Sequence, residues 1–225
     1  MEVMSFRGRL ETQCPNGCEP FETEVWTCIH AAKNPELKEQ ILAGQLNLIV
    51  CPHCCFTFYA EQSLVYLEPE LELIAFIYPI PHEKEREHWE EKMKEDFLQF
   101  QSRLPENKRI PYAPAIFFGL QGLTDLLHRE EEIQDEILVA EWFFRKLGLE
   151  TYRVSASYSR NKKIPKILPR HIRTDRNLRE EVLEGLQILL KENGNLPTYR
   201  RFFQELETSP VSEWETPPKQ GRKPA

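Results

Sequence analysis

Four cysteines in two pairs are the residues whose types and spacing point most clearly to chemistry. The first pair is Cys14 and Cys18, and the second is Cys51 and Cys54. In each pair a proline follows the first cysteine, so the chain turns back and both sulfur atoms can face one centre. Four thiolates suit Zn²⁺, which binds tetrahedrally with Zn–S distances of about 2.3 Å. The pattern predicts one structural zinc ion with no coordination position open to water or substrate.

Two other interpretations of these cysteines stay open: ordinary buried thiols, and a redox dithiol at Cys51 and Cys54. Thioredoxin-type motifs open a helix within a βαβ pattern, whereas this motif leaves one predicted strand and enters another. Cys28 is predicted to be a buried thiol, and Cys55 is an alternative to Cys54 as a ligand. Four thiolates would also suit iron, so ligand type alone does not separate the two metals.

The composition is that of a soluble protein with one or two domains. The chain has 225 residues, of which 40% are hydrophobic and 29% are charged, which is enough to build a core. It has no run of about 18 apolar residues, as a membrane-spanning helix would need, and no N-terminal secretory pattern. We expect a cytoplasmic protein, where thiols stay reduced and six cysteines favour a metal site over disulfides.

The elements that must position the cysteines belong to an α+β fold. Alternating and β-branched runs predict short strands, and the first cysteine pair directly follows one of them. Asn34 as N-cap, Pro35 at the first helical position and Gly44 past the end predict a helix between the two pairs. The predicted strands cover residues 9–13, 21–30, 46–50, 55–59, 63–67 and 71–77.

The pattern changes at residue 82, where apolar residues begin to recur at spacings of three and four on charged segments. The predicted helices include Trp89–Leu104, Ala115–Leu127, Glu130–Leu147, Leu178–Lys191 and Pro197–Leu206. We therefore predict three parts. They are a small zinc-ribbon-like antiparallel module with an inserted helix (1–81), a mostly helical region (82–207) with a basic linker near 152–176, and a disordered tail (208–225).

A basic segment is the second candidate functional feature. The chain has a net charge of −7, yet between Tyr152 and Arg179 there are nine basic residues and one acidic residue. This segment could contact nucleic acid or another anion. We prefer the interpretation that it neutralises the acidic helices of the same chain. The candidate anion contacts are Arg160, Lys162, Lys163, Lys166 and Arg170.

The N-terminal third resembles the CpXC domain family, bacterial proteins with paired Cys-Pro-x-Cys motifs. The first motif here has one additional residue, and Cys55 stands where the family pattern usually has glycine. The resemblance implies a metal-binding domain without an established activity. The stretches that carry it are Cys14-Pro15-Asn16-Gly17-Cys18, Glu24-Val25-Trp26, Asn34-Pro35-Glu36-Leu37, Gly44-Gln45-Leu46-Asn47, Cys51-Pro52-His53-Cys54 and Leu64-Val65-Tyr66.

The sequence carries none of the common nucleotide-binding, hydrolase or metalloprotease motifs, so we do not expect an enzyme. We expect a non-catalytic, zinc-stabilised interaction or scaffold module, with a protein partner or a second copy bound through the helical region 82–207 and no membrane. The alternatives are a nucleic-acid-binding protein that uses the ribbon and the basic segment 152–179, and a dithiol redox protein.

Overall fold

A computed structural model describes residues 4–173 and 176–208 of the chain. The fold is α+β, as predicted, and the chain divides into two compact units, 1–128 and 129–225. The division differs from the boundary expected near residue 81, because the next helix and strand pack and pair with the N-terminal sheet. The tail predicted from residue 208 lies, after Thr208, outside the described residues. No helix in the described ranges has both the length and the apolar content needed to cross a bilayer.

The first unit is built on a five-stranded mixed sheet with strand order β1-β2-β5-β6-β7. Two of its four pairings, β2–β5 and β6–β7, are parallel, so the predicted antiparallel module was wrong in this respect. The sequence also predicted a helix from residue 115, where the structure has β7. The strands are β1 (Phe6–Thr12), β2 (Phe21–His30), β5 (Leu64–Glu68), β6 (Leu73–Tyr78) and β7 (Ala115–Phe118).

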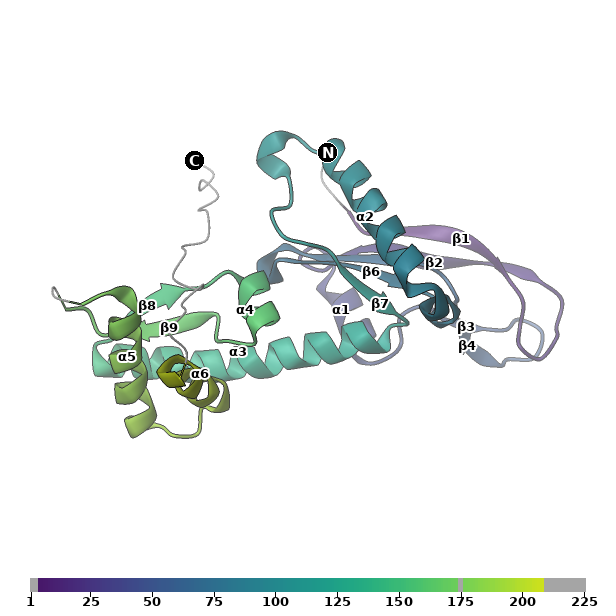
Figure 1. The fold of residues 1–225 in the computed structure, drawn as a ribbon. Coiled ribbons are helices and arrows are strands. Elements are labelled where there is room, and N and C mark those ends of the chain that lie inside the picture. Colours follow the sequence, from purple (N-terminus) through teal and green to yellow (C-terminus); the bar gives the residue numbers. More distant parts are fainter. Residues whose placement is uncertain (1–3, 174–175, 209–225) are drawn as a thin grey trace. The chain divides into compact units, whose positions relative to one another are not determined.

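Helices cover both faces of this sheet. On one face, α1 (Pro35–Leu42) and the first turns of α3 (Gln121–Leu147) pack on Tyr66 and several other buried side chains of β2, β5 and β6. On the other face lies α2 (Arg86–Ser102), whose Met93 is buried against β6 (Figure 1). Short 3₁₀ helices connect these elements; they are η1 (Pro69–Leu71), η2 (Ile80–Glu85) and η3 (Glu106–Lys108).

A separate two-stranded hairpin lies between α1 and β5 in the sequence. It consists of β3 (Leu48–Val50) and β4 (Thr57–Tyr59), which pair antiparallel with each other and with no other strand of the described chain. An isolated hairpin of this length is marginally stable in water. Its geometry therefore depends on contacts with the rest of the first unit and on the conformation of its own loop.

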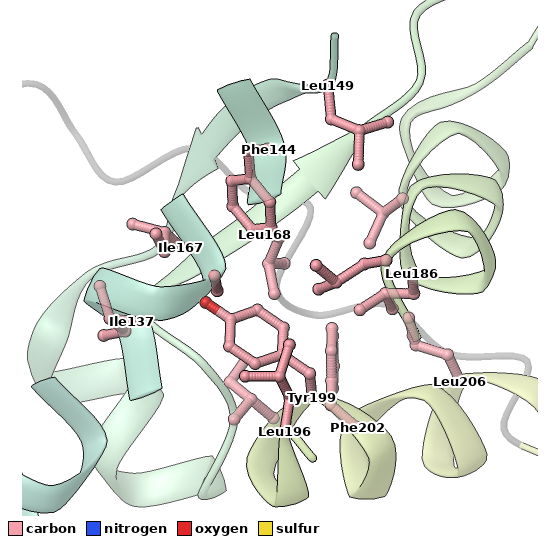
Figure 2. Packing of buried hydrophobic residues seen from close by; sticks show 14 residues of the cluster. Ile137, Phe144, Leu149, Ile167, Leu168, Leu186, Leu196, Tyr199, Phe202 and Leu206 are labelled. Atoms are coloured by element: carbon pink, nitrogen blue, oxygen red, sulfur yellow. The ribbon is translucent and has the colours of Figure 1, made fainter. Parts of the chain in front are cut away.

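The second unit packs helices around a small hairpin. After the last turns of α3 come β8 (Glu150–Arg153), α4 (Ala156–Lys162) and β9 (Ile167–Arg170), where the sequence predicted a basic linker. The core that orders this segment contains Phe144, Leu168, Tyr199 and Phe202 (Figure 2). Its remaining helices are α5 (Leu178–Glu192) and α6 (Pro197–Thr208).

The contact between α5 and β9 requires a residue without a side chain. A Cβ atom added to Gly185 of α5 would lie 2.4 Å from the carbonyl oxygen of Pro169 in β9. Real Cβ atoms do not approach a backbone oxygen so closely. The glycine therefore lets the helix lie directly on the strand and closes the core of the second unit.

Candidate metal centre

The two cysteine pairs lie in the loops of two hairpins. Cys14 and Cys18 lie between β1 and β2, and Cys51 and Cys54 lie between β3 and β4. All four sulfur atoms are within 4.8 Å of one another, and those of Cys14 and Cys54 are 3.6 Å apart. A tetrahedron with metal–sulfur bonds of about 2.3 Å has edges of about 3.8 Å. The donor set therefore fits one tetrahedral metal ion, and the structure brings together the four cysteines predicted as ligands.

Tight turns in each loop turn the two sulfur atoms toward the same side. In the first loop, the N–H of Gly17 donates to the carbonyl oxygen of Cys14 at 2.8 Å. In the second, the N–H of Cys55 donates to the carbonyl oxygen of Cys51 at 3.0 Å. Cys55 has a φ of +60°, a left-handed conformation that glycine adopts without steric cost. A glycine at position 55 would therefore adopt this conformation with less strain than Cys55 does.

Three of the four thiols, those of Cys14, Cys18 and Cys54, have shifted pKa values when no ion is bound. The backbone N–H of Phe56 and the amide of Asn16 donate to the sulfur atom of Cys54 and lower its pKa to about 6. Burial raises the pKa of the Cys14 thiol, and the hydrogen bond with Cys54, followed by burial, raises the pKa of Cys18 to about 12. A metal ion must displace the protons of such thiols, so its affinity falls as the pH is lowered.

Asn47 connects the two hairpins, a role that its position in the sequence does not reveal. Its side-chain oxygen accepts from the N–H of Trp26 at 2.7 Å, and its side-chain N–H donates to the carbonyl oxygen of Trp26 at 2.8 Å. The amide thus pairs with β2 as a neighbouring strand would. Because Asn47 directly precedes β3, these two bonds hold the second cysteine hairpin against the strand that follows the first pair.

The remaining cysteines do not join the cluster. Cys28 is buried in β2, and burial raises its pKa to about 11, in agreement with the predicted structural role. Cys55 is exposed and is not one of the four residues whose sulfur atoms gather. His53 lies exposed within the second loop and makes an edge contact with the ring of Phe21, with 6.3 Å between centroids.

Much of the basic segment pairs with acidic residues of the same unit. Glu130, which is 5% exposed, lies 3.5 Å from the guanidinium of Arg160 and 2.5 Å from the ammonium of Lys166. Arg170 donates to Glu181 at 2.5 Å. At least three of the five candidate anion contacts are therefore used within the chain. Lys162, the last residue of α4, and Lys163, which follows it, are exposed.

Comparison with known families identifies the part of the chain that carries the cysteines. The family model described as CpXC protein matches residues 12–141, which is more than half of the chain. The match starts before the first cysteine pair and extends past α2 and β7, so it covers far more than the motifs themselves. Comparison with curated proteins and with solved structures gives no match.

Proposed function

This chain belongs to the CpXC family, and we propose that it is a non-catalytic interaction module whose first unit is stabilised by one bound zinc ion. The observation that carries the proposal is the gathering of four cysteine sulfur atoms within 4.8 Å of one another. Four protein ligands complete the coordination of tetrahedral zinc, so a substrate or a reactive water has no position on the ion. A site of this type contributes to folding and not to catalysis.

The need for an ion follows from the size of the second hairpin. Its strands have three residues each and pair only with each other in the described chain. Two strands alone are marginal in water, whereas the binding free energy of a structural metal adds to the free energy of folding. A shared ion would fix the two hairpin loops relative to each other, in a zinc-ribbon-like arrangement.

The interaction part of the proposal assigns partner binding to the helical region. On α3, Leu138 and Trp142 are four residues apart and are 56% and 53% exposed. Residues at this spacing lie on one side of a helix, and exposed apolar residues that cluster are typical of protein contacts. We assign to this side of the helix a protein partner in the cytoplasm. The internal pairing of Arg160, Lys166 and Arg170 favours a structural role for the basic segment over nucleic-acid binding.

The deciding experiment measures the metal content of chain purified without chelator. We expect about one zinc per chain, because one tetrahedral site takes four thiolates. A Cys51→Ser, Cys54→Ser double variant should lose the metal and melt at a lower temperature. Cys55→Ser is the matched control, since it also removes a thiol from the same loop, and it should keep the metal.

Two outcomes would overturn the proposal. One is the absence of metal together with reversible oxidation of Cys51 and Cys54, which would identify a redox dithiol. The other is a metal ion that exchanges a ligand with small molecules such as cyanide or azide, since an open coordination position is required for such exchange. If the bound ion is iron, the proposed structural role stands and only the identity of the ion changes.

A further inference from the structure

The first unit contains a pocket that the metal centre does not use. Its volume is about 600 Å³, within the range of about 300–1,000 Å³ that is typical of small-molecule sites. Its walls come from segments far apart in the sequence, namely the end of α1, the loop before β3, the end of β4 and the first turns of α3. None of the four clustered cysteines lines it. The pocket is therefore separate from the metal centre.

Hydrogen bonds between these segments hold the walls of the pocket in place. The hydroxyl of Tyr59 in β4 donates to the carbonyl oxygen of Gly44, just past α1, at 2.5 Å. The hydroxyl of Thr124 in α3 lies 3.3 Å from the carbonyl oxygen of Ile41 in α1 and 3.1 Å from that of Leu120, so it donates to these backbone oxygens. The pocket is therefore formed by the fold before a ligand binds, as small-molecule sites usually are.

Most of the pocket surface is apolar. Two of its large side chains remain open to solvent, since Ile80 is 67% exposed and Tyr59 is 52% exposed. A ligand with an apolar body would cover them and remove their apolar surface from water. The aliphatic side chains that line the pocket include Leu42, Leu46, Leu64, Ile77, Ile80 and Leu120.

Three polar side chains offer the pocket hydrogen-bond acceptors. The hydroxyls of Tyr59 and Thr124 direct their hydrogen atoms to backbone carbonyl oxygens, which leaves their own oxygen atoms to accept. The carboxylate of Glu61 can only accept. No lysine or arginine is among the described residues that line the pocket, and Glu61 is the one acidic residue there. The lining therefore suits a donor and disfavours a negative charge.

We propose that this pocket binds a small organic molecule with an apolar body, at least one N–H or O–H donor and no negative charge, such as an aromatic amine. Burial of the apolar body supplies affinity, and the three acceptors select the donor. Glu61 repels anions, in a chain whose net charge is −7. Nucleotides and other phosphate-bearing ligands are disfavoured, because no cationic side chain offsets this repulsion.

The test compares two fluorescent probes on the zinc-loaded full chain. N-phenylnaphthylamine is uncharged and carries one N–H donor, whereas anilinonaphthalene sulfonate has the same ring system with an added sulfonate. Both brighten in apolar sites, so titration gives a dissociation constant for each. We expect saturable binding of N-phenylnaphthylamine, at least about tenfold tighter than that of the sulfonate.

Glu61→Gln is the decisive variant for ligand charge, because the two probes also differ in solubility. It removes the negative charge and keeps an acceptor of similar size. The affinity for the sulfonate should rise by about fivefold or more, while that for N-phenylnaphthylamine stays within about twofold. Glu61 is exposed, so this substitution tests the site without a risk to the core.

Two further variants test whether the probe occupies the pocket. Ala60→Trp and Gln62→Trp each replace a half-buried residue of the pocket wall with a large ring, and each should weaken N-phenylnaphthylamine binding at least about tenfold. Leu98→Trp is the matched control, since it adds the same ring on α2, at a residue that is 67% exposed and does not line the pocket. It should leave the affinity unchanged. Melting temperatures measured on all variants check that each is folded.

A chain that shows no saturable binding of N-phenylnaphthylamine would overturn the inference, as would binding that Ala60→Trp and Gln62→Trp leave intact. An equal response of both probes to Glu61→Gln would refute the selection against anions. Zinc content measured on the same samples separates these failures from a failure of the proposed function. A zinc-containing chain that binds no probe refutes the pocket alone. A chain without zinc refutes the proposed function, and the same titration then tests the pocket on that chain.

Discussion

Replacing Asn47 should loosen the metal centre although its side chain is not a ligand. The informative substitution is Asn47→Gly, which removes both hydrogen bonds to Trp26 and keeps the left-handed backbone, where φ is +55°. Asn and Gly are the residues that adopt this conformation most readily. The variant therefore removes the two hydrogen bonds without straining the folded backbone.

The expected magnitude follows from the partly buried position of these bonds. Each intramolecular hydrogen bond contributes about 0.5–1.5 kcal/mol net, so the pair contributes about 1–3 kcal/mol. Metal binding requires the second hairpin to lie against β2, so the loss should reduce the apparent zinc affinity. A change of about 1–3 kcal/mol corresponds to about 5- to 150-fold. Asn47→Ala should cost about 1 kcal/mol more, because it also strains the backbone.

The assay is competition for zinc between the protein and a chromophoric chelator at fixed pH, combined with thermal unfolding of the zinc-loaded protein. Asn47→Asp is a further control. It keeps an acceptor for the N–H of Trp26, but it replaces the N–H donor with a second oxygen that faces the carbonyl oxygen of Trp26. It should bind zinc less tightly than the wild type. An Asn47→Gly protein with wild-type zinc affinity and melting temperature would refute the positioning role.

Three further predictions follow from other parts of the structure. Cys55→Gly should raise stability by about 1 kcal/mol, because it relieves the left-handed conformation; a lower melting temperature would contradict this. The buried hydroxyl of Tyr199 has no hydrogen-bond partner among the described residues. Tyr199→Phe should therefore leave unfolding by urea unchanged or shift it upward by up to about 1 kcal/mol, and a clear loss would show that the hydroxyl is bonded. The hydrogen bond with His171, together with the positive charges of Arg173 and Arg176, lowers the pKa of Glu184 below its ordinary value of 4.5. A lowered pKa stabilises the folded state above pH 4.5, and this stabilisation is lost as the pH falls through the folded-state pKa. Glu184→Gln should flatten that part of the stability–pH curve, and an unchanged slope would refute the assignment.

The elements next to the cysteines could be predicted because local chemistry determines them. The proline in each pair, the N-cap and proline at the start of α1 and the alternation along β2 all act within a few residues. The four ligands could be predicted for the same reason, since two closely spaced cysteine pairs are typical of a tetrahedral metal site. The structure gathers these four and excludes Cys28 and Cys55.

The features that escaped prediction depend on partners distant in the sequence. Ala115–Phe118 is an apolar run that suits a helix or a strand equally well, and its pairing with β6, about 40 residues earlier, decides the outcome. A basic linker was predicted near 152–176 because basic residues dominate that segment, whereas Glu130 and Glu181 compensate three of its charges from other elements. Asn47 acts through a bond to a backbone 21 residues away.

The burial of β6 determines what happens when the metal is lost. All six residues of β6 are buried, and the strand pairs on both sides, whereas the cysteine loops lie at hairpin tips away from it. Removal of the ion should therefore open one end of the first unit while its centre stays folded. In hydrogen exchange, the amides of β3 and β4 would exchange faster and those of β6 would keep their rates. Metal availability could then alter one surface of the protein without unfolding the rest.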